Sequence, residues 1–394
     1  MAQLSPQQIE AFDGVMAWHK TKEKRFVLAG YAGAGKTTLA KQIADEIGHN
    51  GTIFCAYTGK AANVLREKEC MNAGTIHSYL YSLTDHDREA MKILNEEMHR
   101  MLKMGDTATA NRISEQVAEM RANYRKPKYD LNMQSKLADA KLVIVDEYSM
   151  LSEELIKHIE LVAKKVLYIG DPFQLPPVKG ECSLQPDYFI TEIHRQALDS
   201  PIIRYSKMVR EGETISFCSE GEFEYGPQQN FGAEIYSDAD QVIVGMNKTR
   251  MEWNKRFRDL AGHEGLPRAG EKMICLKNSP VNGLFNGMIG YAASDARPKR
   301  SEHYILDFDD NAGLNVYAGD INGTGDKYDG YNPYHRTLDR FDFGYAITAH
   351  KSQGSEFDKV VIYNQPIGRG VEAQRWLYTS LTRAKKKCIL VQPR

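Results

Sequence analysis

The groups most able to do chemistry lie in a short glycine-rich segment, residues 30–38. The segment fits the pattern GxxxxGK(S/T), follows the apolar run 25–29 and precedes a helical pattern over residues 39–47. Small residues let successive backbone N–H groups turn toward a polyphosphate, and the N-terminus of the next helix adds its positive end. The segment therefore predicts a nucleotide site, with Lys36 reaching the β and γ phosphates and Thr37 holding Mg²⁺.

Two further polar groups stand where buried strands are expected to end. Asp146 and Glu147 follow the apolar run 141–145, where an acidic pair suits a metal-holding carboxylate and a base that orients water. The run 166–169 leads into a proline-rich loop that contains Gln174, a side chain able to sense a γ-phosphate. A simple proline turn explains the prolines of this loop but not the position of Gln174.

Strands alternating with helices must position these groups, and that alternation predicts a parallel sheet with ligands at the carboxyl ends of its strands. Residues 52–57 predict a second buried strand, followed by a helix that opens at 58–62. A second series comes later in the chain, with strands at 241–244, 359–363 and 388–391 and helices at 247–260 and 371–384. Two such units with one phosphate loop predict an α/β fold with a cleft at their junction.

Two segments interrupt these units. Residues 84–139 predict a helical hairpin, because apolar side chains recur at three- and four-residue spacing on both sides of a break at 105–107. The stripe consists of Met91, Leu94, Met98, Met101, Ile113, Val117, Met120 and Tyr124. We interpret it as the face that packs the two helices together. Residues 269–342, with short alternating runs among Gly, Asp, Asn and Tyr, predict a small antiparallel β insertion.

Composition narrows the class of protein. The 394-residue chain is long enough for two domains, and its 42% hydrophobic and 26% charged content is typical of a soluble globular protein without a membrane span. The N-terminus shows no secretory signal, and six cysteines without a CxxC pair indicate reduced thiols in a cytoplasmic protein. A net charge of −1 excludes a general polycation, so nucleic acid would bind in local grooves.

Two single residues allow alternative interpretations. Ser5 and Pro6 predict a helix start, with Ser5 as N-cap and Pro6 in the first position. Gln8, in the first turn of that helix, is either a plain surface residue or a reader of the donor and acceptor edge of adenine. His77 lies in a short polar segment, 74–78, where a lone histidine is more often structural than functional.

With these pieces placed, the chain resembles superfamily 1 DNA helicases of the RecD and Dda type over nearly its whole length. The segments similar to that family's motifs are Leu4-Ser5 with Gln8 (the Q motif), 30–37 (I), 58–62 (Ia), 75–78 (Ib), 146–150 (II), 170–175 (III), 193–196 (IV), 345–356 (V) and 378–384 (VI). Residues 272–276 and 285–290 are similar to the start of the family's SH3-like insertion. So many motifs in the family's order are very specific.

The resemblance implies roles for individual residues. The hydrolytic centre would contain Lys36, Asp146, Glu147, Gln174, Arg195 and Arg383. Of these, Arg195 and Arg383 would reach across the cleft to the γ-phosphate, where a planar cation stabilises spreading charge. The nucleotide would be held by Gln8, Gly33, Ala34, Gly35, Lys36, Thr37, Thr38 and Glu356, with Thr37 and Asp146 as metal ligands. Single-stranded DNA would be bound by Thr58, Lys60, Thr75, His77, Thr348 and His350.

The resemblance also implies an architecture of two RecA-like P-loop NTPase domains in tandem. The first would comprise residues 1–83 and 140–195, and the second residues 196–268 and 343–394. A helical insertion, 84–139, would interrupt the first domain, and an SH3-like β insertion, 269–342, the second. The sequence departs from the family in two places. Tyr57 stands where proline is usual, and 84–139 reads as helical where relatives often carry a β-hairpin, so we assign no strand-splitting residue.

The activity implied is that of an ATP- and Mg²⁺-dependent DNA helicase moving 5′ to 3′ on single-stranded DNA. Its other partners would be forked duplex DNA and a single-stranded-DNA-binding protein or replisome component. We expect a monomer in the cytoplasm, that of the host if the compact chain is phage-encoded. The alternative is a P-loop ATPase switch or packaging-type ATPase that does not unwind DNA, but it leaves the segments 58–62, 75–78 and 345–356 without a role.

Overall fold

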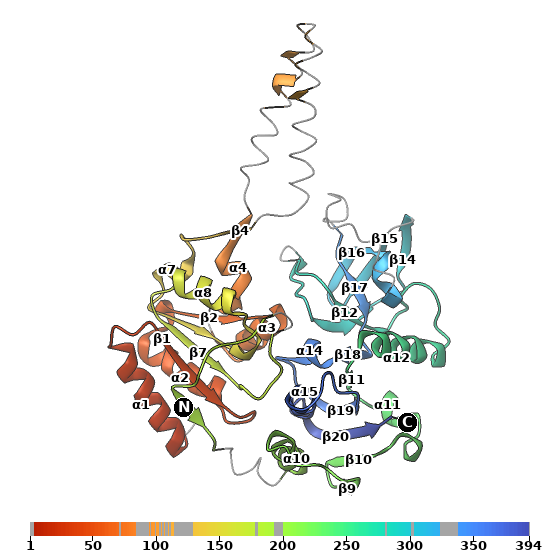
Figure 1. The fold of residues 1–394 in the computed structure, drawn as a ribbon. Helices are drawn as coiled ribbons and strands as arrows, with labels where there is room; N and C mark the ends of the chain where they lie inside the picture. The colour runs from red at the N-terminus through yellow and green to blue at the C-terminus, as the bar shows by residue number, and fades with distance from the viewer. Residues whose placement is uncertain are drawn as a thin grey trace.

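The computed structural model describes residues 4–70, 72–83, 129–177, 180–192, 200–279, 282–300, 303–323 and 338–393, together with short pieces between 94 and 113. The chain forms two six-stranded sheets with helices on their faces and a smaller β-rich part beside the second sheet (Figure 1). Within the described ranges, no helix has the length and apolar character needed to cross a membrane. The predicted α/β class with two parallel-sheet units is confirmed.

The first unit is built on a parallel sheet in the order β3-β2-β6-β7-β1-β8. Its strands are β1 (Arg25–Gly30), β2 (Thr52–Ala56), β3 (Gly74–Thr75), β6 (Leu142–Val145), β7 (Val166–Gly170) and β8 (Tyr188–Ile190). Its helices are α1 (Pro6–His19), α2 (Lys36–Ile47), α3 (Gly59–Glu67), α4 (Ile76–Leu80), α7 (Lys136–Asp139) and α8 (Glu153–Val162), with short turns η1 (His49–Gly51) and η2 (Tyr148–Met150). Helices cover both faces, which explains why β2, β6 and β7 are continuous apolar runs.

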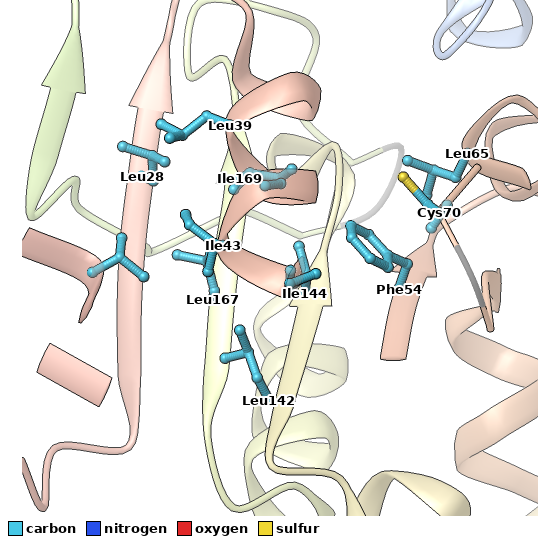
Figure 2. Close-up of a cluster of buried hydrophobic side chains, with 14 of the residues drawn as sticks. Leu28, Leu39, Ile43, Phe54, Leu65, Cys70, Leu142, Ile144, Leu167 and Ile169 are labelled. Atoms are coloured by element: carbon cyan, nitrogen blue, oxygen red, sulfur yellow. The ribbon is translucent and has the colours of Figure 1, made fainter. Parts of the chain in front are cut away.

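Alternate strand residues fill the two cores of this unit. Leu28 and Leu167 belong to the cluster on the face covered by α2, where Leu39 and Ile43 of that helix pack against the sheet (Figure 2). Their neighbour Val27 points to the opposite cluster, where α4, α7 and α8 pack. Because side chains along a strand alternate between faces, each strand secures both helical layers at once. The polar residues that follow β1, β2, β6 and β7 are thereby held at one edge of the sheet.

The second unit has the strand order β18-β11-β19-β20-β10-β9, parallel except for the terminal pair β10 and β9. The strands are β9 (Cys218–Glu220), β10 (Phe223–Pro227), β11 (Gln241–Val244), β18 (Ala346–Thr348), β19 (Phe357–Tyr363) and β20 (Ala384–Gln392). The helices are α10 (Pro201–Arg210), α11 (Glu234–Ser237), α12 (Asn247–Leu260), α14 (Ala349–Ser352) and α15 (Val371–Leu381), with the turn η3 (Gln228–Asn230). The sheet thus repeats the architecture of the first unit, but no glycine-rich phosphate loop follows any of its described strands.

One predicted helix is too long. The pattern over 371–384 continues to Ala384, but α15 ends at Leu381 and Ala384 begins β20. Arg383 donates through Nε to the carbonyl of Thr379 at 3.0 Å, so a side chain satisfies a carbonyl at the end of the helix. The backbone from Ala384 onward pairs instead with β19. This correction places Arg383 in a tight connection between helix and strand.

The predicted antiparallel β insertion is also confirmed. Its described residues form two three-stranded sheets, ordered β13-β12-β17 and β14-β15-β16. The bounds are β12 (Lys272–Cys275), β13 (Ile289–Tyr291), β14 (Arg297–Arg300), β15 (His303–Phe308), β16 (Asn311–Tyr317) and β17 (Phe341–Phe343), with the turn η5 (Ala318–Gly323). Side chains of both sheets share one buried cluster, so the insertion has a core of its own.

The segment 84–139 is described only in part. Leu94, Met98 and Met101 are helical, as predicted, whereas Met91, Val117, Met120 and Tyr124 lie outside the described residues. The segment also contains β5 (Tyr129–Leu131), which pairs antiparallel with β4 (Tyr81–Leu83). Leu137 of α7 belongs to a core cluster of the first unit, so the C-terminal end of 84–139 packs with the first sheet.

Helix α12 fixes the β insertion to the second unit through side chains four residues apart. Arg250 Nη1 lies 2.6 Å from Asp342 Oδ2 in β17. Asn254 hydrogen-bonds through its amide to the backbone around β17 and β18. Arg258 pairs with Glu271 through two contacts, Nε to Oε1 at 2.8 Å and Nη2 to Oε2 at 3.2 Å, and both side chains are buried. Residues at this spacing share one helix face, so the insertion is held along the helix.

Candidate active site

The segment between β1 and α2 has the geometry of a phosphate loop. Gly33 and Gly35 have φ of +80° and +73°, in the left-handed region that favours glycine. Helix α2 begins at Lys36, so its first N–H groups are directed at the loop. The Nζ of Lys36 donates to the carbonyls of Gly30 and Tyr31 at 2.7 and 2.8 Å. Loop backbone, helix N-terminus and ammonium therefore lie together, as polyphosphate binding requires.

Gln8 is tied directly to this loop. Its side chain is only 3% exposed, which excludes the interpretation as a plain surface residue. Its Oε1 accepts from the backbone N of Ser5 at 2.9 Å, and its Nε2 donates to the carbonyl of Ala34 at 2.9 Å. Ser5 caps α1 and accepts in turn from the backbone of Gln8, so the predicted helix start is confirmed. Thr37 and Thr38 lie in the first turn of α2, beyond Ala34.

The acidic pair follows β6 as predicted. The backbone N of Glu147 donates to Asp146 Oδ1 at 2.9 Å. Burial, and then the charge of Glu147, raise the pKa of Asp146 to about 7, while the charge of Lys36 opposes that rise. Glu147 has φ of 55° and ψ of 47°, a left-handed conformation that strains a residue other than glycine. Such strain persists only where the surrounding structure holds it, and it is common at functional sites.

The oxygen donors at this place suit a magnesium ion bound together with a nucleotide. Mg²⁺ usually takes one or two carboxylates and the phosphates of its substrate. Thr37 lies in the first turn of α2, and Asp146 lies close enough to Lys36 for that charge to act on its pKa, so these two residues could supply such hard oxygen ligands. In the part of the chain that the structure describes, no group of three His, Cys, Asp or Glu side chains is placed to hold a metal without a substrate.

Arg383 joins the second unit to the loop that follows β7. It is 4% exposed, and its Nη2 donates to Gln174 Oε1 at 3.3 Å. Its Nη1 donates to the carbonyl of Ser355 at 3.2 Å, which orients the guanidinium within the second unit. The structure thus brings together two predicted site residues that are 209 positions apart in the sequence.

Two residues at the same junction, Asp171 and Tyr378, are not among the predicted site residues. The hydroxyl of Tyr378 in α15 donates to Asp171 Oδ2 at 2.6 Å, and the backbone N of Ala32 donates to the same oxygen at 3.1 Å. Burial, and then the charge of Asp171, raise the pKa of Tyr378 well above its usual value. A fully buried carboxylate therefore connects the second unit to the tip of the phosphate loop. The one signal in the sequence that could have identified them is that both residues lie inside segments similar to family motifs.

The cleft contacts predicted for two other residues, Glu356 and Arg195, stay predictions. Glu356 is exposed and forms an ion pair with Lys385 at 3.2 Å. Arg195 lies outside the described residues, so its place at the cleft stays a prediction.

Two threonines predicted to touch DNA serve as helix caps. Thr58 Oγ1 accepts from the backbone N of Ala61 at 3.1 Å at the start of α3. Thr75 Oγ1 accepts from the backbone N of Ser78 at 3.2 Å at the start of α4. Both hydroxyls stabilise their helices. Thr58 and Thr75 thus both lie at the carboxyl edge of the first sheet, and both hydroxyls are already engaged in capping.

Lys60 brings α3 against the second unit. Its Nζ lies 5.0 Å from the centre of the Phe357 ring in β19, and burial lowers the pKa of Lys60 to about 8. On the second unit, Thr348 ends β18 and His350 lies in α14. Burial lowers the pKa of His350, which favours a neutral ring at neutral pH. The predicted DNA contacts thus occupy both units.

A row of rings continues from His77 across the first unit. The centre of the His77 ring lies 5.7 Å from Tyr57 and 5.7 Å from Tyr81. Tyr81 in turn binds His158, with its hydroxyl 2.7 Å from Nδ1. Tyr57 and His77 are exposed. Exposed rings that lie next to one another are suited to stacking against nucleic-acid bases.

Two parallel-sheet units, with a phosphate loop on the first and a tyrosine of the second bonded to it, define a tandem P-loop NTPase fold. Residues 3–221 match a family described as an AAA domain, and residues 343–391 match the UvrD-like helicase C-terminal domain. The chain therefore belongs to the AAA-domain family, and its residues 343–391 are similar to the UvrD-like helicase C-terminal domain.

Individual relatives agree with this assignment. The ATP-dependent RecD2 DNA helicase of Deinococcus radiodurans is 27% identical, over 98% of this chain and 48% of its own length. This chain thus spans about half of that relative. A Pif1 helicase structure concerned with unwinding at forked double-stranded DNA has a TM-score of 0.57 and 18% identity, covering 99% of this chain and 92% of its own. The Pif1 helicase of Bacteroides with ADP-AlF3 and single-stranded DNA has a TM-score of 0.56 and 17% identity, covering 100% and 93%. The predicted resemblance to RecD-type superfamily 1 helicases is confirmed.

Proposed function

We propose that this protein is an ATP-dependent DNA helicase that moves 5′ to 3′ along single-stranded DNA and unwinds duplex DNA. The observation that carries the proposal is the set of contacts from α15 and the residues after it to the first unit. Tyr378 binds Asp171 beside Ala32, and Arg383 binds Gln174. A nucleotide bound at the phosphate loop would therefore affect the arrangement of both units. A motor whose domains open and close needs this coupling between the nucleotide site and both domains.

The residues of the cleft divide the work of phosphoryl transfer. Thr37 and Asp146 would hold a Mg²⁺ ion bound together with ATP, and that ion would neutralise phosphate charge. Lys36 binds the β and γ phosphates, and Glu147 orients the attacking water. Arg383, with Arg195 as the second arginine, stabilises the charge that spreads over the transferred group. Gln174 reports the state of the γ-phosphate, since its amide is bonded to Arg383.

The nucleotide contacts follow the same loop. Gly33, Ala34, Gly35 and Thr38 contribute backbone groups to the phosphates, while Gln8 reads adenine and also supports Ala34. Glu356 contributes from the second unit.

Single-stranded DNA is proposed to bind across the carboxyl edges of both sheets. Support comes from the helix starts at Thr58 and Thr75, from Lys60, and from the exposed rings of His77 and Tyr57. Thr348 and His350 continue this surface onto the second unit. Phosphate binding by helix N-termini and stacking by rings would together hold a strand without sequence preference.

The direction of movement and the partners rest mainly on the resemblance. The anchoring of the β insertion by Arg250 and Arg258 supports a rigid module that guides the strand without swinging. We further propose a monomer that acts in the cytoplasm on forked DNA, together with a single-stranded-DNA-binding protein or a replisome component. The domain boundaries 1–83 with 140–195, 84–139, 196–268 with 343–394, and 269–342 are part of the same proposal.

The test uses two forked duplexes that differ only in which strand carries a single-stranded tail, at equal Mg-ATP. We expect unwinding of the substrate with the 5′ tail. Equal or faster unwinding of the 3′-tailed substrate would contradict the direction. ATP turnover without unwinding of either substrate would favour the alternative, an ATPase switch or packaging-type ATPase.

A further inference from the structure

Arg210, the last residue of α10, reaches from the second unit onto the phosphate loop. Its guanidinium carbon lies 3.3 Å from the centre of the Tyr31 ring, and the residue is 8% exposed. Tyr31 directly follows β1 and precedes the left-handed Gly33. A cation over the face of an aromatic ring is attracted by the ring's quadrupole, and the attraction grows as water is excluded. This contact therefore joins the two units at the loop itself.

Two rings of the first unit also pack against the Tyr31 ring. Its centre lies 4.9 Å from Phe189 in β8 and 5.8 Å from Phe173 in the loop after β7. The guanidinium of Arg210 also lies 5.9 Å from the centre of the Phe173 ring. Tyr31 thus has a fixed orientation, and Arg210 contacts both loops that border the nucleotide site.

The second unit fixes Arg210 equally well. Nε2 of Gln374 in α15 donates to the carbonyls of Val209 and Arg210, each at 2.7 Å. Tyr378, four residues further along the same helix, is the side chain that binds Asp171. Helix α15 therefore supports both the Arg210–Tyr31 contact and the Tyr378–Asp171 hydrogen bond. A movement of this helix would displace both contacts together.

We propose that Arg210 and Tyr31 are a positioning pair that sets the phosphate loop against the second unit whenever the two units close. Arg210 is not an arginine for the γ-phosphate, because its guanidinium faces the Tyr31 ring, with Glu211 Oε1 3.5 Å away. The stack stabilises the closed arrangement, in which Lys36 and Arg383 act on the same phosphate. Loss of the stack lowers the fraction of molecules in that arrangement. The proposal rests on the proposed ATP hydrolysis at this cleft.

The test compares steady-state ATP turnover with saturating single-stranded DNA. Arg210→Ala and Tyr31→Leu should each lower kcat about tenfold, because a desolvated cation–π contact is lost. The KM for ATP and the Kd for the strand should stay within about twofold, since neither residue binds phosphate or DNA directly. Tyr31→Phe keeps the ring and should retain full turnover. The double variant Arg210→Ala with Tyr31→Leu should be no slower than either single variant.

Arg204 is a matched control on the same helix. Its guanidinium lies 5.0 Å from the Tyr205 ring and pairs with Glu220, away from the junction, so Arg204→Ala should leave kcat unchanged. Unchanged kcat in Arg210→Ala, or fully additive losses in the double variant, would overturn the positioning pair. A shift confined to the KM for ATP would overturn it too. No ATP turnover in the parent protein would instead overturn the proposed function.

Discussion

The second unit meets its two neighbours through junctions of different construction. Against the β insertion, α12 forms ion pairs that are almost entirely buried, among them Arg258 with Glu271. Against the first unit, α15 and Arg383, two residues beyond its end, supply single contacts to loops, such as Tyr378 to Asp171. Breaking a buried ion pair leaves a charge without its partner and is costly, whereas one hydrogen bond to a loop can be exchanged during movement. From this difference we expect the β insertion to move with the second unit and the molecule to open at the cleft.

The two junctions also contain buried arginines with different roles. Arg258 and Arg383 are both buried arginines of the second unit. Arg258 is saturated by a carboxylate and by backbone carbonyls within the unit and its insertion. Arg383 reaches a neutral amide of the other unit, and its charge has no carboxylate partner among the described residues. An uncompensated guanidinium at a nucleotide cleft is suited to meeting a phosphate.

The largest effect is expected at the cleft. Arg383→Ala should lower kcat for ATP by roughly 10³ or more, as loss of such an arginine does in related phosphoryl transfers. The KM for ATP should change far less, because the charge is needed mainly in the transition state. Steady-state kinetics measure both. Lys386→Ala, three residues on and exposed, is the control and should be unaffected. Unchanged kcat with a raised KM would mean that Arg383 only holds nucleotide.

Mutations at the junction between α12 and the β insertion should lower the stability of the protein and leave its ATP turnover unchanged. Arg258→Ala leaves Glu271 buried without its partner and should lower the free energy of unfolding by about 3–5 kcal/mol. Thermal or urea unfolding measures this change. Replacing both residues, with Arg258→Met and Glu271→Leu, should recover most of the loss, since no lone charge remains. A single variant as stable as the parent would show that the junction is not held by this pair.

A smaller effect is expected from the hydrogen bond of the cleft. Tyr378→Phe removes the hydroxyl that donates to Asp171 and should weaken closure by about 1.5–3 kcal/mol. Turnover with single-stranded DNA should fall accordingly, by one to two powers of ten at most. Tyr363→Phe, on β19, is a control with the same chemical change. If both variants turn over at the parent rate, Asp171 does not transmit closure through Tyr378.

The smallest effect concerns pH and Lys60. Its pKa is lowered from the usual 10.5 to about 8 by burial, so the ammonium loses its charge as pH rises through that value. If Lys60 contacts the strand, affinity for single-stranded DNA should weaken a few-fold between pH 7 and pH 9. Lys272 has a similarly lowered pKa of about 8, so Lys60→Arg is needed to separate the two. Arginine stays charged, and this variant should lose the pH dependence. If Lys60→Arg shows the same pH dependence as the parent, a group other than Lys60 causes the loss of affinity.

Local signals explain why much of the site could be predicted from the sequence. The phosphate loop lies between a strand and a helix that are adjacent in the chain, so pattern and spacing define it. Asp146 and Glu147 follow an apolar run directly, and the predicted helix 247–260 coincides with α12. Periodicity and flanking residues are sufficient where neighbours in sequence are neighbours in space.

Contacts between distant segments could not be predicted in this way. Tyr378 and Asp171 are 207 positions apart, and nothing around either residue indicates the partner. Thr58 and Thr75 show a second limit, since a threonine at a strand end can cap a helix or contact a ligand, and the sequence pattern is the same. The end of α15 depends on Arg383 bonding to the backbone of Thr379, a tertiary detail that helix periodicity does not contain.

The most direct test of the account is ATP turnover by the intact chain with Mg²⁺, measured with and without single-stranded DNA. Lys36→Ala excludes contaminating activity, and Lys41→Ala on the same helix, paired with Glu69, is its matched control. We predict Mg²⁺-dependent turnover that the strand stimulates strongly. Lys36→Ala should abolish that turnover while strand binding and the Lys41→Ala variant remain near the parent. Turnover that is equal with and without the strand, or that survives Lys36→Ala within a few-fold, would contradict a DNA motor driven from this cleft.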